Sequence, residues 1–279
     1  MSAPPRDRSV ESAGPSSRGV LVTGSSRGVG AATARAFAAR GDRVAVHYHG
    51  SEDLAREVLA SLPGEGHGLV RADLGDPAAV ERLATEAVGL LGRIDVLVNN
   101  AAMIVAPEEG RGRRGTHPLE ETSYPDWVAV WERTLATNLL GPAHLVWQVA
   151  RHMIDVPPGE GLPTGRIVDV GSRGAYRGEP DIPAYGASKA GLHSLGQSMA
   201  VRLAPHGITV LGIAPGFIAT EMAGYALAGE QGAAIRAQSP FDRVATPEEV
   251  ADAVVALADP WSRWASGAVL DFNGASHLR

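Results

Sequence analysis

The sequence predicts a single α/β domain built on a doubly wound, seven-stranded parallel sheet with helices on both faces. The 279 residues contain seven short runs rich in β-branched residues, and longer helical stretches separate these runs. Each short run is apolar almost throughout, a pattern typical of parallel strands buried on both faces. The alternation continues without an internal repeat or a break, so we expect one domain.

The predicted strands, in order along the chain, are residues 19–23, 43–48, 68–72, 94–99, 166–171, 208–214 and 268–272. About six helices fill the intervals, as a doubly wound sheet requires, and two of them carry start signals. Asp76 is placed to cap a helix that has Pro77 at its first position. Thr246 and Glu249 have the spacing of a capping box before another apolar helix.

The first residues of the chain differ in composition from the rest. Residues 1–18 are rich in proline, serine and charge, and we expect them to form a disordered tail. The domain itself is predicted to cover residues 19–279.

Composition excludes several classes of protein. Lys and Arg total 25 against 31 Asp and Glu, and without a basic run we expect no nucleic-acid partner. The absence of cysteine excludes disulfide frameworks, zinc ribbons and thiol nucleophiles, and the nine histidines show no metal-ligand spacing. No metal site is therefore expected. With no apolar stretch of about 18 residues and no secretory signal, we expect a cytoplasmic protein away from membranes.

A glycine-rich turn at residues 23–30 follows the first predicted strand and leads into an alanine-rich helix. Glycine lets the backbone turn tightly and approach a pyrophosphate, whose charge the helix N-terminus stabilises. The turn therefore predicts a dinucleotide site. Its candidate contacts are Gly24, Ser25, Ser26, Arg27, Gly28, Val29 and Gly30.

The end of the second strand indicates which dinucleotide is bound. A carboxylate there would bond the ribose 2′-hydroxyl of NAD. This chain instead has Tyr48 between two histidines, and Arg27 in the turn can reach a 2′-phosphate. NADP(H) is therefore predicted in preference to NAD(H). The alternative, with Arg27 solvated and NAD bound through other contacts, stays open.

Tyr185 and Lys189 are four residues apart and so share one face of a predicted helix. Lys189 is the only lysine in a chain that otherwise uses 24 arginines. An ammonium about 4 Å from the phenol would stabilise a phenolate by about 4 kcal/mol at a dielectric constant of about 20. We therefore expect the pKa of Tyr185 to fall from about 10 toward 7, which suits a proton donor at neutral pH.

Together these motifs resemble the short-chain dehydrogenase/reductase family over most of the chain. They run in the family's order: residues 23–30, Asp73-Leu74, residues 99–102, Asn138, Gly171-Ser172, Tyr185 with Lys189, and residues 215–220. The resemblance implies a single-domain Rossmann-type fold. It also implies an oxidoreductase that moves hydride between a nicotinamide and a carbonyl carbon. One departure is Ala102, where the family's motif has glycine.

The resemblance assigns roles to the matching residues. Tyr185 would be the proton donor in reduction or the base in oxidation, and Lys189 would lower its pKa and bind the nicotinamide ribose. Ser172 would bond the substrate oxygen, and Asn138 would hold a water linked to Lys189. These four are the predicted catalytic residues, and Tyr185 and Lys189 are also predicted to contact the dinucleotide. The further candidate dinucleotide contacts are Tyr48, Asp73, Leu74, Asn100, Ala101, Pro215, Gly216, Ile218 and Thr220.

Within the family, the pattern is most similar to the 3-oxoacyl carrier-protein reductases. We predict NADP(H)-dependent reduction of a carbonyl, in a 3-oxoacyl thioester or a similar ketone, to a secondary alcohol with Tyr185 as proton donor. The alternative is an NAD-dependent alcohol, sugar or steroid dehydrogenase. A non-catalytic dinucleotide sensor is disfavoured because all four catalytic positions are kept.

Three features bear on the small-molecule substrate. Residues 217–240, which include Phe217, Met222 and Tyr225, are expected to form a mobile lid. Residues 107–115 are an insert at the carboxyl end of a strand, where they either gate the substrate or lie on the surface. The two arginines after Ser172 are expected either to be solvated or to meet an anionic substrate: Arg173 and Arg177.

The resemblance also implies assembly into a homotetramer, or a homodimer. Helices around residues 124–153 and 184–203 would pack the subunits together. Three tryptophans are candidates for that contact or for the core: Trp127, Trp131 and Trp147.

Overall fold

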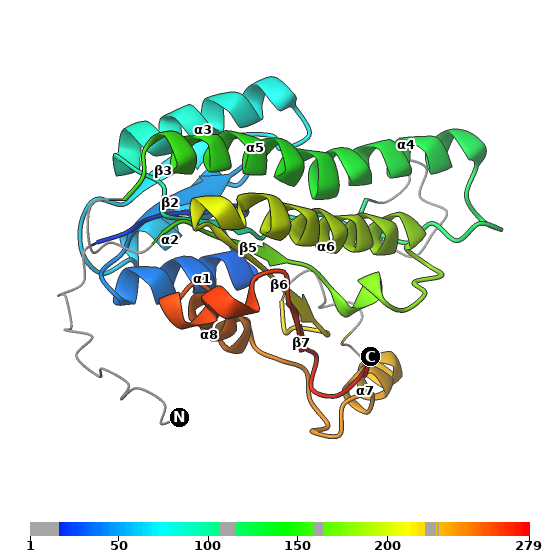
Figure 1. Ribbon diagram of the computed structural model, residues 1–279. Helices are drawn as coiled ribbons and strands as arrows, with labels where there is room; N and C mark the ends of the chain where they lie inside the picture. The colour runs from blue at the N-terminus through cyan, green and yellow to red at the C-terminus, as the bar shows by residue number, and fades with distance from the viewer. Residues whose placement is uncertain (1–16, 106–114, 159–163, 221–226, 228) are drawn as a thin grey trace, which may run out of the picture.

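The computed structural model describes residues 17–105, 115–158, 164–220, 227 and 229–279, and it confirms the predicted fold (Figure 1). Seven parallel strands form one sheet in the order β3-β2-β1-β4-β5-β6-β7. The strands are β1 (Gly19–Val22), β2 (Arg43–Tyr48), β3 (Gly68–Arg71), β4 (Val96–Asn99), β5 (Arg166–Val170), β6 (Thr209–Pro215) and β7 (Val269–Phe272). Each predicted strand is found within one or two residues of its expected bounds.

Eight α-helices lie in the described part of the chain. They are α1 (Gly28–Ala39), α2 (Glu52–Ala60), α3 (Pro77–Leu91), α4 (Tyr124–Leu135), α5 (Gly141–Asp155), α6 (Pro183–Leu203), α7 (Gly229–Arg236) and α8 (Pro247–Leu257). Shorter helical turns are the π-helix η1 (Ala136–Leu140) and the 3₁₀ turns η2 (Arg173–Ala175), η3 (Ala204–His206) and η5 (Pro260–Ala265). Among the described residues, no helix is both long and apolar enough to cross a membrane.

Helices cover both faces of the sheet. Successive strand residues point to opposite faces, so both sets of side chains are buried. Val20 and Val22 of β1 pack with α1, α2 and α8, whereas Leu21 between them packs with α3, α5 and α6. Figure 1 shows α1 and α8 on one side of the sheet and α3, α5 and α6 on the other. The same alternation explains why each strand is a nearly continuous apolar run in the sequence.

Both predicted helix starts are confirmed. The Asp76 side chain accepts a hydrogen bond of 2.9 Å from the N–H of Ala78, with Pro77 at the first position of α3. Thr246 and Glu249 form a reciprocal capping box at the start of α8.

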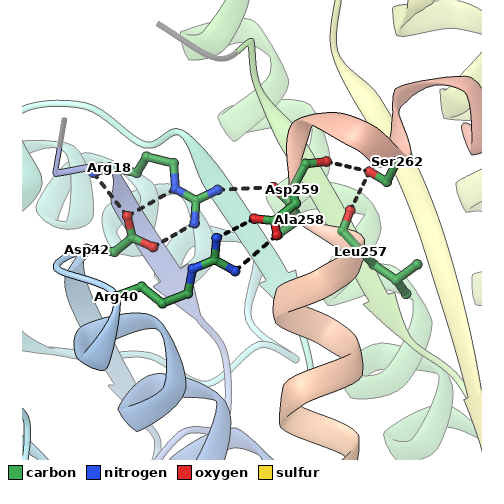
Figure 2. Close-up of polar contacts among 7 residues, drawn as sticks. All are labelled: Arg18, Arg40, Asp42, Leu257, Ala258, Asp259 and Ser262. Atoms are coloured by element: carbon green, nitrogen blue, oxygen red, sulfur yellow. Dashed lines mark hydrogen bonds and ion pairs between the residues drawn. The ribbon is translucent and has the colours of Figure 1, made fainter. Parts of the chain in front are cut away.

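A polar clamp closes the amino end of the sheet, far from the carboxyl ends of the strands (Figure 2). The Arg18 guanidinium donates two hydrogen bonds, of 3.0 and 2.7 Å, to the Asp42 carboxylate. It donates a third, of 3.0 Å, to the carbonyl of Ala258. Arg40 pairs with Asp259 at 2.8 Å beside it. Arg18 therefore belongs to the fold, which corrects its expected place in a disordered tail; residues 1–16 lie outside the described residues.

Candidate active site

A cavity of about 680 Å³ follows the carboxyl ends of the strands, centred where the chain reverses direction in the sheet between β1 and β4. Open α/β sheets bind ligands at such a switch point. Sixteen positions are predicted to bind the dinucleotide without also acting in catalysis, and fifteen of them line this cavity. The fifteen that line the cavity are Gly24, Ser26, Arg27, Gly28, Val29, Gly30, Tyr48, Asp73, Leu74, Asn100, Ala101, Pro215, Gly216, Ile218 and Thr220.

Ser25 is the predicted contact that the structure places elsewhere. Its side chain is fully buried, donates to the carbonyl of Val22 at 2.8 Å, and accepts from the N–H of His47 at 2.9 Å. These bonds tie the turn to β1 and β2. The Ser25 hydroxyl therefore points into the sheet, and Ser25 does not line the cavity.

The glycine turn has the shape that a bound pyrophosphate requires. Gly24 and Gly28 have φ angles of 64° and 56°, which side chains rarely adopt. At Gly30 a Cβ would lie 2.3 Å from the carbonyl oxygen of Gly24, so only glycine lets α1 begin this close to the turn. No side chain caps the first turn of α1, and its N–H groups open on the cavity. The residues present therefore fit a dinucleotide phosphate.

His47 is a functional residue that sequence reasoning missed. Its Nδ1 accepts a hydrogen bond of 2.9 Å from the N–H of Gly24, and its Nε2 lies 3.2 Å from the carbonyl of Ala72. Burial lowers the pKa of His47 to about 4, so the ring is neutral at pH 7 and holds the phosphate turn in place. Its position at the end of β2 was the only available signal.

The lowered pKa of His47 predicts that the stability of the fold depends on pH. Its folded pKa of about 4 is below the unfolded value of 6.5, so the unfolded chain takes up the proton first. Stability is therefore lost as the pH falls from about 6.5 to about 4. In a His47→Asn variant, the Asn Oδ1 can still accept the hydrogen bond from Gly24. Between about pH 6.5 and about pH 4, the melting temperature of this variant should fall by roughly 5 °C less than that of the wild type. If His49→Asn, at an exposed histidine, reduced the fall in melting temperature as much as His47→Asn does, this assignment would be contradicted.

Three of the four predicted catalytic residues meet at the other end of the cavity: Ser172, Tyr185 and Lys189. Ser172 lies two residues after β5, at the start of η2, and is hydrogen-bonded to Tyr185, which lies in the first turn of α6. Lys189, one turn further along α6, donates to the carbonyl of Val170 at 2.8 Å. Its Nζ is 5.8 Å from the centre of the Tyr185 ring. The geometry therefore places a phenol, a hydroxyl and an ammonium around one point.

The expected lowering of the Tyr185 pKa is wrong in this structure. Burial raises the pKa of Tyr185 to about 12, against a smaller lowering by the Ser172 hydrogen bond. The charge of Glu179 raises it further. An ammonium about 4 Å away would lower this pKa only if the cost of burying a phenolate were smaller than the attraction between the two charges. The phenol therefore holds its proton firmly.

Asn138 lies behind this centre. It sits in the π-helix η1 between α4 and α5, where its Oδ1 accepts from the N–H of Met103 at 2.9 Å. Its Nδ2 donates to the carbonyl of Met103 at 2.9 Å and to Ser188 Oγ at 3.3 Å. Asn138 does not line the cavity. It links the loop after β4 to α6, and single π-helical turns of this kind occur frequently at functional sites.

The end of the cavity near β2 is lined by charged groups. Asp73 Oδ2 lies 3.4 Å from Arg133 of α4 and 3.7 Å from His49. Arg133 is a second residue that sequence reasoning missed, because α4 is far from the turn along the chain. Arg27 and Arg133 are thus two cations that line the cavity. They accompany the lack of a carboxylate at the end of β2, from which NADP was predicted.

The two arginines after Ser172 differ from each other. Arg173 is buried, donates to Ser276 Oγ and Gln238 Oε1, and lies against Phe217, so its expected place in solvent is wrong. Arg177 is partly exposed and lies 3.7 Å from Glu179. Arg173 thus joins three segments beside the site.

Some of the predicted substrate features lie outside the described residues. These are residues 107–114 of the insert, and Met222 and Tyr225 of the lid. The later part of the predicted lid forms α7. Among the residues that the structure describes, no three His, Asp or Glu side chains are grouped so that they could hold a metal ion.

The fold and the cavity define an oxidoreductase of the dinucleotide-binding α/β class. A family model described as enoyl-(acyl carrier protein) reductase matches residues 24–277. The chain belongs to the short-chain dehydrogenase/reductase family.

Individual relatives cover nearly the whole chain. It is 35% identical over 261 residues to cis-4-hydroxycyclohexanecarboxylate dehydrogenase of Sinomonas cyclohexanicum, covering 92% of this chain and 95% of that protein. It is 34% identical to the 3-oxoacyl-(acyl-carrier-protein) reductase of Escherichia coli strain K12, covering 92% and 96%. A short-chain dehydrogenase from Burkholderia cenocepacia J2315, solved in complex with NADP, superposes with a TM-score of 0.79 at 32% identity, covering 94% and 98%.

Proposed function

We propose that this protein reduces a carbonyl, in a 3-oxoacyl thioester or a similar ketone, to a secondary alcohol with NADPH. One observation carries the proposal: a single cavity joins the glycine turn with Arg27 at one end to Ser172, Tyr185 and Lys189 at the other. The similarity to a 3-oxoacyl-(acyl-carrier-protein) reductase and to a chain that binds NADP supports it.

The chain's own residues supply binding and proton transfer, and a bound NADPH would supply the hydride. The Ser172 hydroxyl orients the substrate oxygen next to the Tyr185 phenol. Because burial keeps this phenol protonated, Tyr185 is in the form that a reduction needs, ready to give its proton to the developing alkoxide. Lys189 places a positive charge beside the same oxygen.

The test is the decrease in absorbance of reduced nicotinamide, with NADPH and NADH compared against a short 3-oxoacyl thioester. We expect turnover with NADPH that is faster than with NADH and about 10³-fold slower in a Tyr185→Phe variant. Tight NADPH binding without turnover would reject the thioester and keep the site. Failure to bind either dinucleotide would reject the proposed function.

Arg27 is the residue that the cofactor preference depends on. In an Arg27→Ala variant the loss of a cation beside the 2′-phosphate should raise the KM for NADPH by about tenfold and leave the KM for NADH nearly unchanged. Steady-state kinetics with both cofactors measure this. Arg35→Ala, on the outer part of the same helix, is the matched control. A parallel rise in both KM values would show that Arg27 only shapes the turn.

A second candidate function is the oxidation of an alcohol or sugar with NAD. It is favoured by the similarity to cis-4-hydroxycyclohexanecarboxylate dehydrogenase, whose name describes an alcohol oxidation. The raised pKa of Tyr185 argues against it, because the tyrosine would have to act as the base. Rates measured in both directions with both cofactors separate the two candidates.

Assembly of several copies, as a homotetramer or homodimer in the cytoplasm, is part of the proposal. Large apolar side chains are exposed on the helices that would form the contact: Tyr124 of α4, Trp147 of α5 and Val201 of α6. The other two candidate tryptophans, Trp127 and Trp131, contact each other at 5.7 Å between ring centres and are partly buried. Trp147 is therefore the strongest of the three candidate contacts.

A further inference from the structure

A group of polar side chains is buried between the sheet and α6, directly behind the catalytic end of the cavity. Its members are Asn99 of β4, Asp169 of β5, and Lys189 and His193 of α6, and each is at most 4% exposed. Buried ionisable groups are costly, so their presence in the core requires a reason. Only Lys189 has a role in the proposed reaction.

Asp169 is the acidic member of this group. One carboxylate oxygen, Oδ1, accepts a hydrogen bond of 2.8 Å from Asn99 Nδ2. No ion pair joins Asp169 to Lys189, and the Lys189 ammonium instead donates to the carbonyl of Val170, the residue after Asp169. The carboxylate and the ammonium therefore act on each other through space, because the carbonyl that Lys189 binds belongs to the residue next to Asp169 on β5.

The fold leaves room for these groups by placing glycine opposite them. A Cβ at Gly196 of α6 would lie 2.8 Å from Asp169 Oδ2, and one at Gly171 would overlap the ring of His193. The cavity beside Asp169 and His193 measures about 10 Å³. A space of this size holds on the order of one water molecule, so solvent screens the charges there only weakly.

Among the described residues, Asp169 is the anionic group whose charge acts on Lys189. Tyr185 and His193 lie on the same helix, and burial keeps Tyr185 protonated and lowers the pKa of His193 to about 4. The charge of Lys189 also lowers the pKa of His193. Arg279 lowers this pKa more weakly, and Asp271 raises it. Burial lowers the pKa of Lys189 to about 8, and the charge of Asp169 opposes this lowering. At neutral pH the charge of Lys189 therefore depends on Asp169.

We propose that Asp169 is a positioning residue of the active site, a buried carboxylate whose negative charge keeps the Lys189 side chain in its ammonium form. The proposal adds to the proposed function a residue that touches neither substrate nor dinucleotide. Without Asp169, burial would drive Lys189 toward the neutral amine and remove the positive charge from beside Tyr185.

The sequence makes a direct test possible, because Lys189 is the only lysine. Protein grown with ¹³Cε-labelled lysine, and free of added lysines, gives one signal whose pH titration reports Lys189 alone. In Asp169→Asn, which keeps the shape and removes the charge, the midpoint should lie about one pH unit lower than in the wild type. The matched control is Asp42→Asn, which removes an equally buried carboxylate at the clamp of Figure 2 and should leave the midpoint unchanged.

The wild type offers a second measurement in case Asp169→Asn does not fold. Burial raises the pKa of Asp169 to about 6, so the Lys189 signal should show a further inflection near that pH. Asp42→Asn should keep this inflection. A midpoint in Asp169→Asn within about 0.3 pH units of the wild type, or a wild-type titration without the inflection, would overturn the proposal.

Kinetics separate this proposal from the proposed function. If NADPH-dependent reduction is observed, Asp169→Asn should match the wild type at pH 5.5, where Asp169 is protonated, and fall about tenfold below it at pH 8.5. A merely structural defect would lower kcat equally at every pH. A chain that shows the expected Lys189 titration but no turnover would reject the proposed function and retain the Asp169–Lys189 coupling.

Discussion

Replacing Tyr185 by phenylalanine is expected to lower kcat for carbonyl reduction by about 10³-fold, which corresponds to about 4 kcal/mol of transition-state stabilisation. The phenol is hydrogen-bonded to Ser172, and Lys189 Nζ lies 5.8 Å from the centre of its ring. Phenylalanine keeps the ring and its packing at the start of α6 but has no proton to give. Dinucleotide affinity, measured by fluorescence titration with NADPH, should change less than about twofold.

The matched control for this change is Tyr124→Phe. Tyr124 is 78% exposed at the start of α4 and does not line the cavity, so loss of its hydroxyl should leave kcat unaltered. If Tyr185→Phe retained more than about a tenth of the wild-type kcat, another group would have to be the proton donor.

The second large effect is expected from Gly30→Ala. The added methyl group would meet the backbone carbonyl of Gly24 at 2.3 Å and the amide of Asn100 at 2.5 Å. Neither neighbour can move freely, because Asn100 donates to the carbonyls of Thr23 and Gly24 at 2.8 and 3.2 Å. We expect a loss of about 3 kcal/mol in unfolding free energy, roughly 10 °C in Tm, and at least about tenfold weaker NADPH binding.

Gly89→Ala gives the comparison. Gly89 lies within α3, is exposed, and has nothing within 4 Å of the position that a Cβ would take. The same substitution there should stabilise the protein by about 0.5–1 kcal/mol, because alanine favours a helix. Urea unfolding and NADPH titration of both variants test the argument. Equal stability of the two variants would show that α1 can move away from the turn.

The fold and most of the cavity could be predicted because they depend on local patterns. Continuous apolar runs gave the strands, and the turn at residues 23–30 could be located from its glycines alone. The capping residues Asp76 and Thr246 act within three or four residues of their own position. The family's ordered motifs then placed Ser172, Tyr185 and Lys189 at one site.

Other features could not be predicted because they depend on what folding brings together. The bond from Gly24 to His47 joins residues 23 apart, and Arg133 reaches the cavity from another helix. The pKa of Tyr185 was misjudged for the same reason, since spacing along a helix shows a nearby ammonium but not how deeply the phenol is buried. The inward direction of the Ser25 hydroxyl could not be predicted either, because a motif does not show which way a side chain points.

The order of the strands also has a consequence for how the chain folds during its synthesis. From β1 the sheet extends to β2 and β3 on one side and then to β4, β5, β6 and β7 on the other. Each described strand after β1 therefore leaves the ribosome when a neighbour for it has already been made, and can join at a free edge. The phosphate turn emerges early, whereas Tyr185 follows only after β5. A nascent chain can thus shape its nucleotide-binding half well before it acquires the means to carry out a reaction.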